Sequence, residues 1–197
     1  MKTAKAFDTR KLVLLAVLTA IVVILQFLGA FIKFGPFSIS LVMLPIAIGA
    51  ALVGTYAGGW LGLVFGLVVL LSGDAGAFLA INPAATVAIV LLKGVLAGLA
   101  AGAIYKLFAA KRKTAAAIAA AAICPIVNTG VFLIGSYMFF LPTLTQWGVA
   151  AGAVSVTAYI FLTLISFNFI FEFGINLVLS PTIVRLVQYG QDRGGGV

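Results

Sequence analysis

Long apolar runs separated by short polar turns are the dominant pattern along this chain. Read as helices, the runs predict six spans, at about 12–32, 41–54, 58–72, 84–107, 115–141 and 152–179. Apolar residues are continuous within each run and do not alternate with polar ones, which argues against a transmembrane β-barrel. We therefore expect an all-α integral membrane protein, with residues 1–197 forming a single transmembrane domain, a bundle of six helices.

Composition and charge agree with that pattern and orient it. Hydrophobic residues make up 64% of the chain and charged residues 8%, far from the balance of soluble proteins. Ten of the twelve Lys and Arg fall on one side of the predicted bundle, which places that side and both termini in the cytoplasm: residues 2, 5, 10, 11, 106, 111, 112, 113, 185 and 193. Orientation and anionic lipid account for the net charge of +8, so nucleic-acid binding is not expected.

Polar side chains recur on one face of the last predicted span. Asn168, Glu172 and Asn176 stand at i, i+4 and i+8, so they project from the same side of a helix. A carboxylate at membrane depth costs about 3 kcal/mol on insertion scales, which predicts that this face turns inward. Two interpretations stay open: a polar pocket that binds a ligand, or hydrogen bonds that hold helices together.

A second buried charge, Lys93, lies in the fourth predicted span. It is about 14 Å from the outer end of that helix, too deep to reach the membrane surface easily. Its anion is either Glu172 or a group carried by a ligand that arrives from outside. The preceding outer loop contains Asp74, Phe78 and Asn82; Asn82 precedes a proline and is a candidate both for ligand contact and for capping the next helix.

The fifth predicted span contains a proline and two polar residues, in the stretch Pro125 to Gly130. We expect a break in the helix there, with Asn128 lining a cavity. Tyr137 lies near the outer side with other aromatic residues, ahead of an outer loop that holds Pro142 and Trp147. The chain has one cysteine and no histidine, so neither a disulfide within the chain nor a histidine-containing metal site is expected. We expect no cofactor.

Several of these stretches together resemble one family. Ala16 and Ala20 form an AxxxA pattern in the first span, and GPFSISLVMLPIAIGAALVG, LLKGVLAGLAAGAIYKL and PIVNTG follow in the second, fourth and fifth spans. With the span count, they resemble an S component, the substrate-binding subunit of an energy-coupling factor (ECF) vitamin transporter.

The resemblance implies a function as well as a fold. Such subunits bind a vitamin on the outer side of a prokaryotic cell membrane and dock on a T subunit through the alanine face of helix 1, here Ala16 and Ala20. Two cytoplasmic ATPases drive import, and this chain has no GxxxxGK[ST] motif of its own. It would then be a transport subunit and not an enzyme, with substrate contacts at Lys93, Asn128, Asn168, Glu172, Asn82, Phe78 and Tyr137.

A buried lysine beside amide and hydroxyl groups suits a small ligand with a carboxylate, so pantothenate is the preferred substrate. Aromatic residues near the outer side leave pyridoxine and riboflavin open. Two other classes compete. A small membrane enzyme would use Glu172 and Asp74 as catalytic carboxylates, but chain order places them toward opposite sides. A passive channel would need a polar stripe across several spans, which is missing from the pattern.

Overall fold

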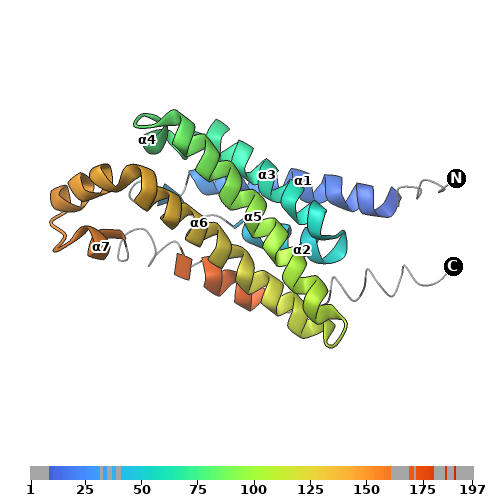
Figure 1. Cartoon of the computed structure of the whole chain (residues 1–197). Helices are drawn as coiled ribbons and strands as arrows, with labels where there is room; N and C mark the ends of the chain where they lie inside the picture. The colour runs from blue at the N-terminus through green and yellow to red at the C-terminus, as the bar shows by residue number, and fades with distance from the viewer. Residues whose placement is uncertain are drawn as a thin grey trace, which may run out of the picture.

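The computed structural model describes residues 9–31, 33–34, 37–38, 41–160, 169–170, 172–179, 185 and 189. The chain ends, expected in the cytoplasm, and Asn168 lie outside these residues. Described elements are α1 (Thr9–Ala30), a hairpin of β1 (Lys33–Phe34) and β2 (Phe37–Ser38), α2 (Met43–Leu52), α3 (Thr55–Leu71), α4 (Gly76–Leu79), α5 (Pro83–Ala109), α6 (Lys113–Ala150) and α7 (Val156–Tyr159) (Figure 1). Residues 172–179 are also helical.

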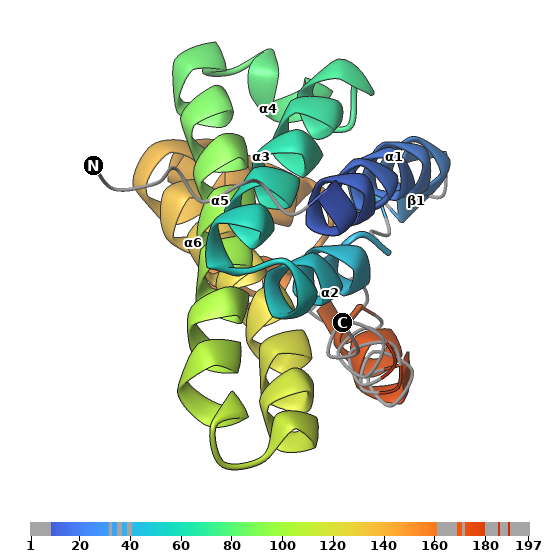
Figure 2. The ribbon, with the colours of Figure 1, turned by 90° about the vertical axis from the view of Figure 1, so that its right-hand side faces the viewer.

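The described helices form a bundle of the predicted all-helical class. Among them α1, α5 and α6 are long and apolar enough to cross a membrane, while α2 and α3 are shorter apolar helices, as the runs at 41–54 and 58–72 predict. In Figure 2, α3 and α5 occupy the middle, α1 and α2 lie to one side, and α6 crosses behind α5. The hairpin pairs Lys33 with Ser38 and Phe34 with Phe37 in antiparallel register.

Glycines bring α3 and α5 into backbone contact. Gly58 and Gly62 of α3 face Gly98 and Gly94 of α5, and a Cβ on any of the four would overlap the carbonyl group of its partner. Each helix therefore carries a small-xxx-small pair against the other, the arrangement that lets membrane helices approach most closely. The result is a thin central unit on which the remaining helices pack.

The helix break expected at Pro125 is not present. α6 runs without interruption for 38 residues and contains both Pro125 and Pro142, so the stretch expected to be an outer loop is helical too. Each proline removes one N–H bond, but a full break would leave several backbone groups unpaired in an apolar surrounding. At 1.5 Å per residue α6 is about 57 Å long, well beyond the roughly 30 Å of a bilayer core.

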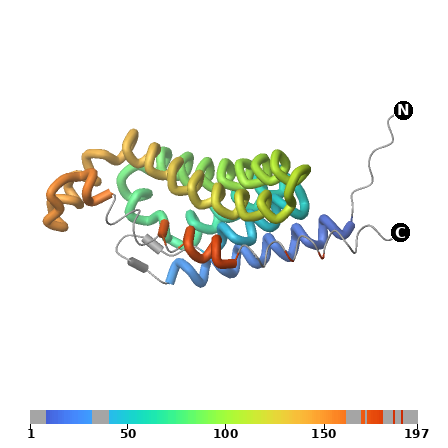
Figure 3. Tube along the Cα trace, turned by 90° about the horizontal axis from the view of Figure 1, so that it is seen from below, coloured from blue at the N-terminus to red at the C-terminus, as the bar shows by residue number. Residues whose placement is uncertain are grey.

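The last predicted span, 152–179, is described only in part. A turn at Gly152, with a φ of 70°, leads to α7, where Ser155 Oγ accepts a hydrogen bond from the Ala158 backbone N–H at 3.1 Å. The helical residues 172–179, coloured red in Figure 3, lie alongside α1 in that view. In Figure 2 the same residues lie below α2.

Two apolar clusters hold the described part of the bundle together. The larger one joins α1, α2, α3, α5 and α6 and contains the fully buried Val22, Ile46 and Leu61. The smaller one lies where α4, α5 and the later part of α6 meet, around Phe78, Ile89 and Phe140. Through Phe78, this second cluster packs the four-residue α4 against α5 and α6.

Candidate functional site

An aromatic cluster centred on Phe78 marks one end of the candidate site. The Phe78 ring makes edge-to-face contacts with Phe132, Phe140 and Trp147 of α6, at centroid distances of 5.6, 5.0 and 5.5 Å. Phe78 is only 5% exposed although it comes from a short connecting helix. Edge-to-face aromatic pairs add about 1 kcal/mol each beyond area burial, so the cluster ties α4 firmly to α6.

Lys93 of α5 lies directly against this cluster. Its ammonium nitrogen is 5.2 Å from the centre of the Phe132 ring and 5.4 Å from that of Phe65 on α3. Both distances are within cation–π range. Phe132 therefore contacts both the Phe78 ring and the half-buried ammonium group of Lys93.

Two carboxylates attract Lys93. Glu172, 4% exposed, and Asp74, in the turn between α3 and α4, both exert a favourable Coulomb interaction on its ammonium group. Chain order places the two acids toward opposite sides; the structure instead brings both within electrostatic reach of one cation. Glu172 and Asn176 are buried one turn apart, so the prediction that this face turns inward is confirmed for the two described members.

Gln26 is a site residue that sequence reasoning missed. Its Nε2 donates a hydrogen bond to Asp74 Oδ2 at 3.2 Å, and the side chain is 0% exposed. The signal was present in the sequence, since Gln26 is a long polar side chain inside an apolar run. What could not be seen there is its partner, which is 48 residues away along the chain.

Two buried polar atoms on α6 flank Phe132. Asn128 Oδ1 and Ser136 Oγ, one turn before and one turn after that ring, have no hydrogen-bond partner among the described residues. Asn128 is thus buried one turn from Phe132 in an intact helix, and its contact with substrate stays a prediction. Ser136 was not predicted, because a serine in a membrane helix usually bonds its own backbone and carries no distinctive pattern.

Asn82 and Tyr137, two further predicted site residues, make contacts other than with Lys93. Asn82 caps α5: its Oδ1 accepts a hydrogen bond from the Ala85 backbone N–H at 3.1 Å, which supports the capping alternative. Tyr137 is 45% exposed, and its hydroxyl lies 3.4 Å from Thr157 Oγ1. Tyr137 is five residues after Phe132, so its side chain lies about 140° around the helix from that ring. The structure does not bring it to Lys93.

The expected docking residues Ala16 and Ala20 are both exposed on α1. Thr19, between them, accepts a hydrogen bond from Trp60 Nε1 at 3.2 Å, so the indole of α3 lies next to this alanine face. The face is small, apolar and uncovered by the described part of the chain.

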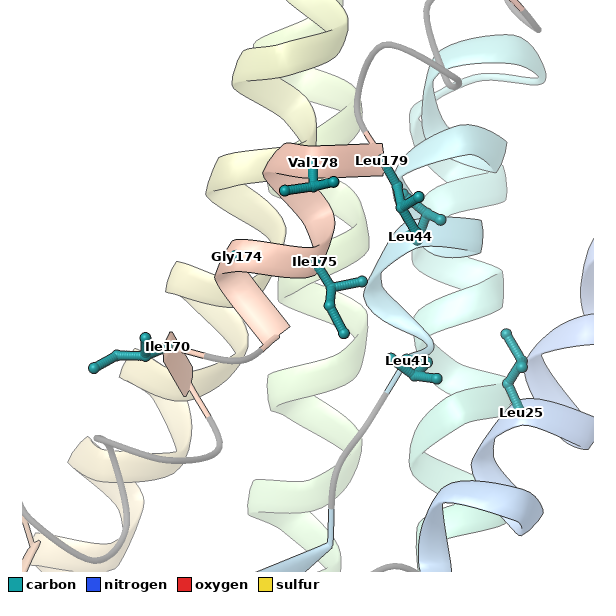
Figure 4. Close-up of a pocket in the computed structure, with 8 residues that line it drawn as sticks. All are labelled: Leu25, Leu41, Leu44, Ile170, Gly174, Ile175, Val178 and Leu179. Atoms are coloured by element: carbon teal, nitrogen blue, oxygen red, sulfur yellow. The ribbon is translucent and has the colours of Figure 1, made fainter.

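A separate cavity of about 720 Å³ lies between the helical residues 172–179, α2 and α1. Figure 4 shows its aliphatic lining, which contains none of the predicted site residues: Leu25, Leu41, Leu44, Ile170, Gly174, Ile175, Val178 and Leu179. A polar ligand needs converging polar groups for orientation, and these side chains offer none. The polar groups instead converge around Lys93, so we take that region as the candidate site.

Comparisons with known proteins identify the family and the fold of this chain. The profile of the family described as "ECF transporter, substrate-specific component" matches residues 10–184. Among solved structures, ThiT from Listeria monocytogenes is similar, with a TM-score of 0.65 at 21% identity over 93% of this chain and 96% of that one. No curated protein sequence matches the chain. Because the family profile covers most of its length, the chain belongs to the ECF transporter substrate-specific component family.

Proposed function

We propose that this chain is the high-affinity substrate-binding subunit of an ECF-type, ATP-driven importer of a small water-soluble vitamin in the plasma membrane of a prokaryote. Family membership supports a substrate-specific transport subunit that works with a T subunit and ATPase subunits and is not itself an ATPase. The observation that supports the site is Lys93, a cation held against the rings of Phe65 and Phe132 at a place where Glu172 and Asp74 both attract it.

Pantothenate is the substrate we propose first. Its carboxylate would bind the Lys93 ammonium group, and its hydroxyl and amide N–H groups would donate to Asn128 Oδ1 and Ser136 Oγ, which otherwise lack partners. A flat ring such as that of riboflavin or pyridoxine would need free aromatic faces. In the cluster around Phe78 the rings already contact one another edge to face, which favours a flexible polar ligand.

Glu172 is the second group that we assign to substrate. It is buried and attracts Lys93, so it would hold the cation in place and accept a hydrogen bond from a ligand hydroxyl. Asn168, one turn earlier on the predicted helix, belongs to the same proposal. Phe78 would close the site from the outer side.

The test is to identify what the purified protein carries. Protein produced in a vitamin-rich host is measured by native mass spectrometry, and any bound molecule is released and identified. A stoichiometric vitamin, absent from Lys93→Ala protein prepared in the same way, is the expected result. A protein that is empty and shows no thermal shift with any vitamin of a broad panel would overturn the proposal.

A further inference from the structure

Residues 73–82, which we call the cover segment, connect α3 to α5 next to Lys93. The segment includes α4 and begins at Gly73, whose φ of +76° few other residues adopt. It is attached at three points: Asp74 to α1 through Gln26, Phe78 to α6 through its ring contacts, and Asn82 to α5 as its cap. The bond to Gln26 joins the segment to α1, a helix that takes no part in the aromatic cluster.

The hydrogen bond between Gln26 and Asp74 stabilises both side chains. A fully buried amide that lost its partner would pay the cost of desolvation, while a hydrogen bond to a charged acceptor is stronger than a neutral one. The same carboxylate attracts Lys93. By fixing Asp74, Gln26 therefore fixes both the start of the cover segment and a negative charge that faces the candidate site.

We propose that Gln26 is a positioning residue, which holds the cover segment closed over Lys93 through its hydrogen bond to Asp74. Gln26 acts through Asp74 and is not assigned a contact with the ligand. The proposal rests on the proposed function for its consequence, slow release of the bound vitamin, but the closure itself belongs to the protein without ligand.

Hydrogen–deuterium exchange of the ligand-free protein tests the closure. The backbone N–H groups of residues 76 and 78–82 all donate within the segment, so they exchange when it opens. In Gln26→Leu these amides should exchange about tenfold faster, because a hydrogen bond to a charged group is lost. Exchange in the paired glycine region of α3 and α5 should stay unchanged, which separates local opening from general destabilisation.

Matched variants sharpen this experiment. Thr19→Val removes a polar side chain from the same helix away from Asp74 and should leave the segment protected. Asp74→Leu should also speed exchange, and the effect of the double variant should be smaller than the two single effects combined, because both substitutions remove the same bond. Asp74→Asn keeps an acceptor oxygen and should have the smaller effect. If Gln26→Leu fails to fold, Gln26→Asn, too short to make the same bond, replaces it.

Unchanged exchange in Gln26→Leu, or strictly additive effects in the double variant, would overturn the positioning role. Dissociation of radiolabelled pantothenate provides a second readout, with about tenfold faster release expected for Gln26→Leu than for Thr19→Val. Wild-type protein that binds no pantothenate while Gln26→Leu opens the segment would refute pantothenate as the substrate and leave the positioning role of Gln26 intact.

Discussion

At Lys93 one ammonium group is kept in the membrane by several weak partners. Each cation–π contact contributes from about 0.5 to 2 kcal/mol, against a cost of about 3 kcal/mol for a lysine at the centre of a membrane helix. Phe65 and Phe132, together with attraction from Glu172 and Asp74, can offset that cost. The same ammonium group is the one that we propose to bind the carboxylate of a ligand.

Replacing Lys93 should affect anionic ligands selectively. In Lys93→Ala we expect affinity for pantothenate to fall by about 10- to 100-fold, the loss of one hydrogen bond to a charged group, and affinity for a neutral analogue with an alcohol in place of the carboxylate to change little. Isothermal titration calorimetry measures both. Lys106→Ala, exposed at the far end of the same helix, is the control. If affinity for the two ligands fell equally, Lys93 would have a structural role and would not bind the carboxylate.

Replacing Ser136 should change stability and ligand affinity in opposite directions. Its buried Oγ lacks a partner among the described residues, and such a group costs about 1–3 kcal/mol. Ser136→Ala should therefore leave the midpoint of thermal unfolding unchanged or raise it by a few degrees, while ligand affinity falls. A lower midpoint together with unchanged affinity would show that the hydroxyl stabilises the fold and has no role in binding.

At the scale of elements, the contact between α3 and α5 depends on the absence of side chains. In Gly62→Ala the new methyl group would overlap the Gly94 carbonyl, so we expect the helices to separate at a cost of about 1–3 kcal/mol. The unfolding midpoint should fall by about 2–4 °C per kcal/mol, as measured by differential scanning fluorimetry in detergent.

Gly130 of α6 is the matched control for that experiment. It is also helical, but nothing lies within 4 Å of a Cβ built there. Gly130→Ala should be neutral or stabilise by up to about 1 kcal/mol, because alanine is the better helix former. If both substitutions had the same effect, helix propensity and not close packing would govern the glycines of α3.

At the scale of the whole molecule, the alanine face of α1 is the surface through which we expect the T subunit to dock. Ala20→Trp should abolish co-purification with the T subunit and stop uptake, because bulk prevents close helix approach, while vitamin affinity of the isolated subunit is unchanged. Ile134→Trp adds the same bulk at a position that is 65% exposed on α6 and should leave the complex intact. If Ala20→Trp formed the complex at wild-type yield, the T subunit would have to dock on another surface.

Some features of this protein could be predicted from the order of its residues alone. Apolar runs are dictated by the cost of exposing backbone and polar groups to lipid, so the all-helical class, the short second and third helices and the inward face of Glu172 and Asn176 could be predicted from the sequence. The cap at Asn82 is equally local, since the asparagine and the N–H that it bonds are three residues apart. Family motifs in the same runs were enough for the transporter resemblance.

Tertiary structure decided everything that depends on which helix meets which. Pro125 predicts a break when considered alone, but the surrounding hydrogen-bond ladder and the apolar environment keep α6 continuous. Asp74 has no local partner in the sequence and obtains Gln26 from another helix, and Lys93 obtains its two rings from α3 and α6. Local polarity was enough to predict that Glu172 and Asn176 turn inward, because a polar face in an apolar helix is costly in lipid. Only the packing of the bundle decided which side chains converge on Lys93, because contacts between distant segments are not encoded in local periodicity.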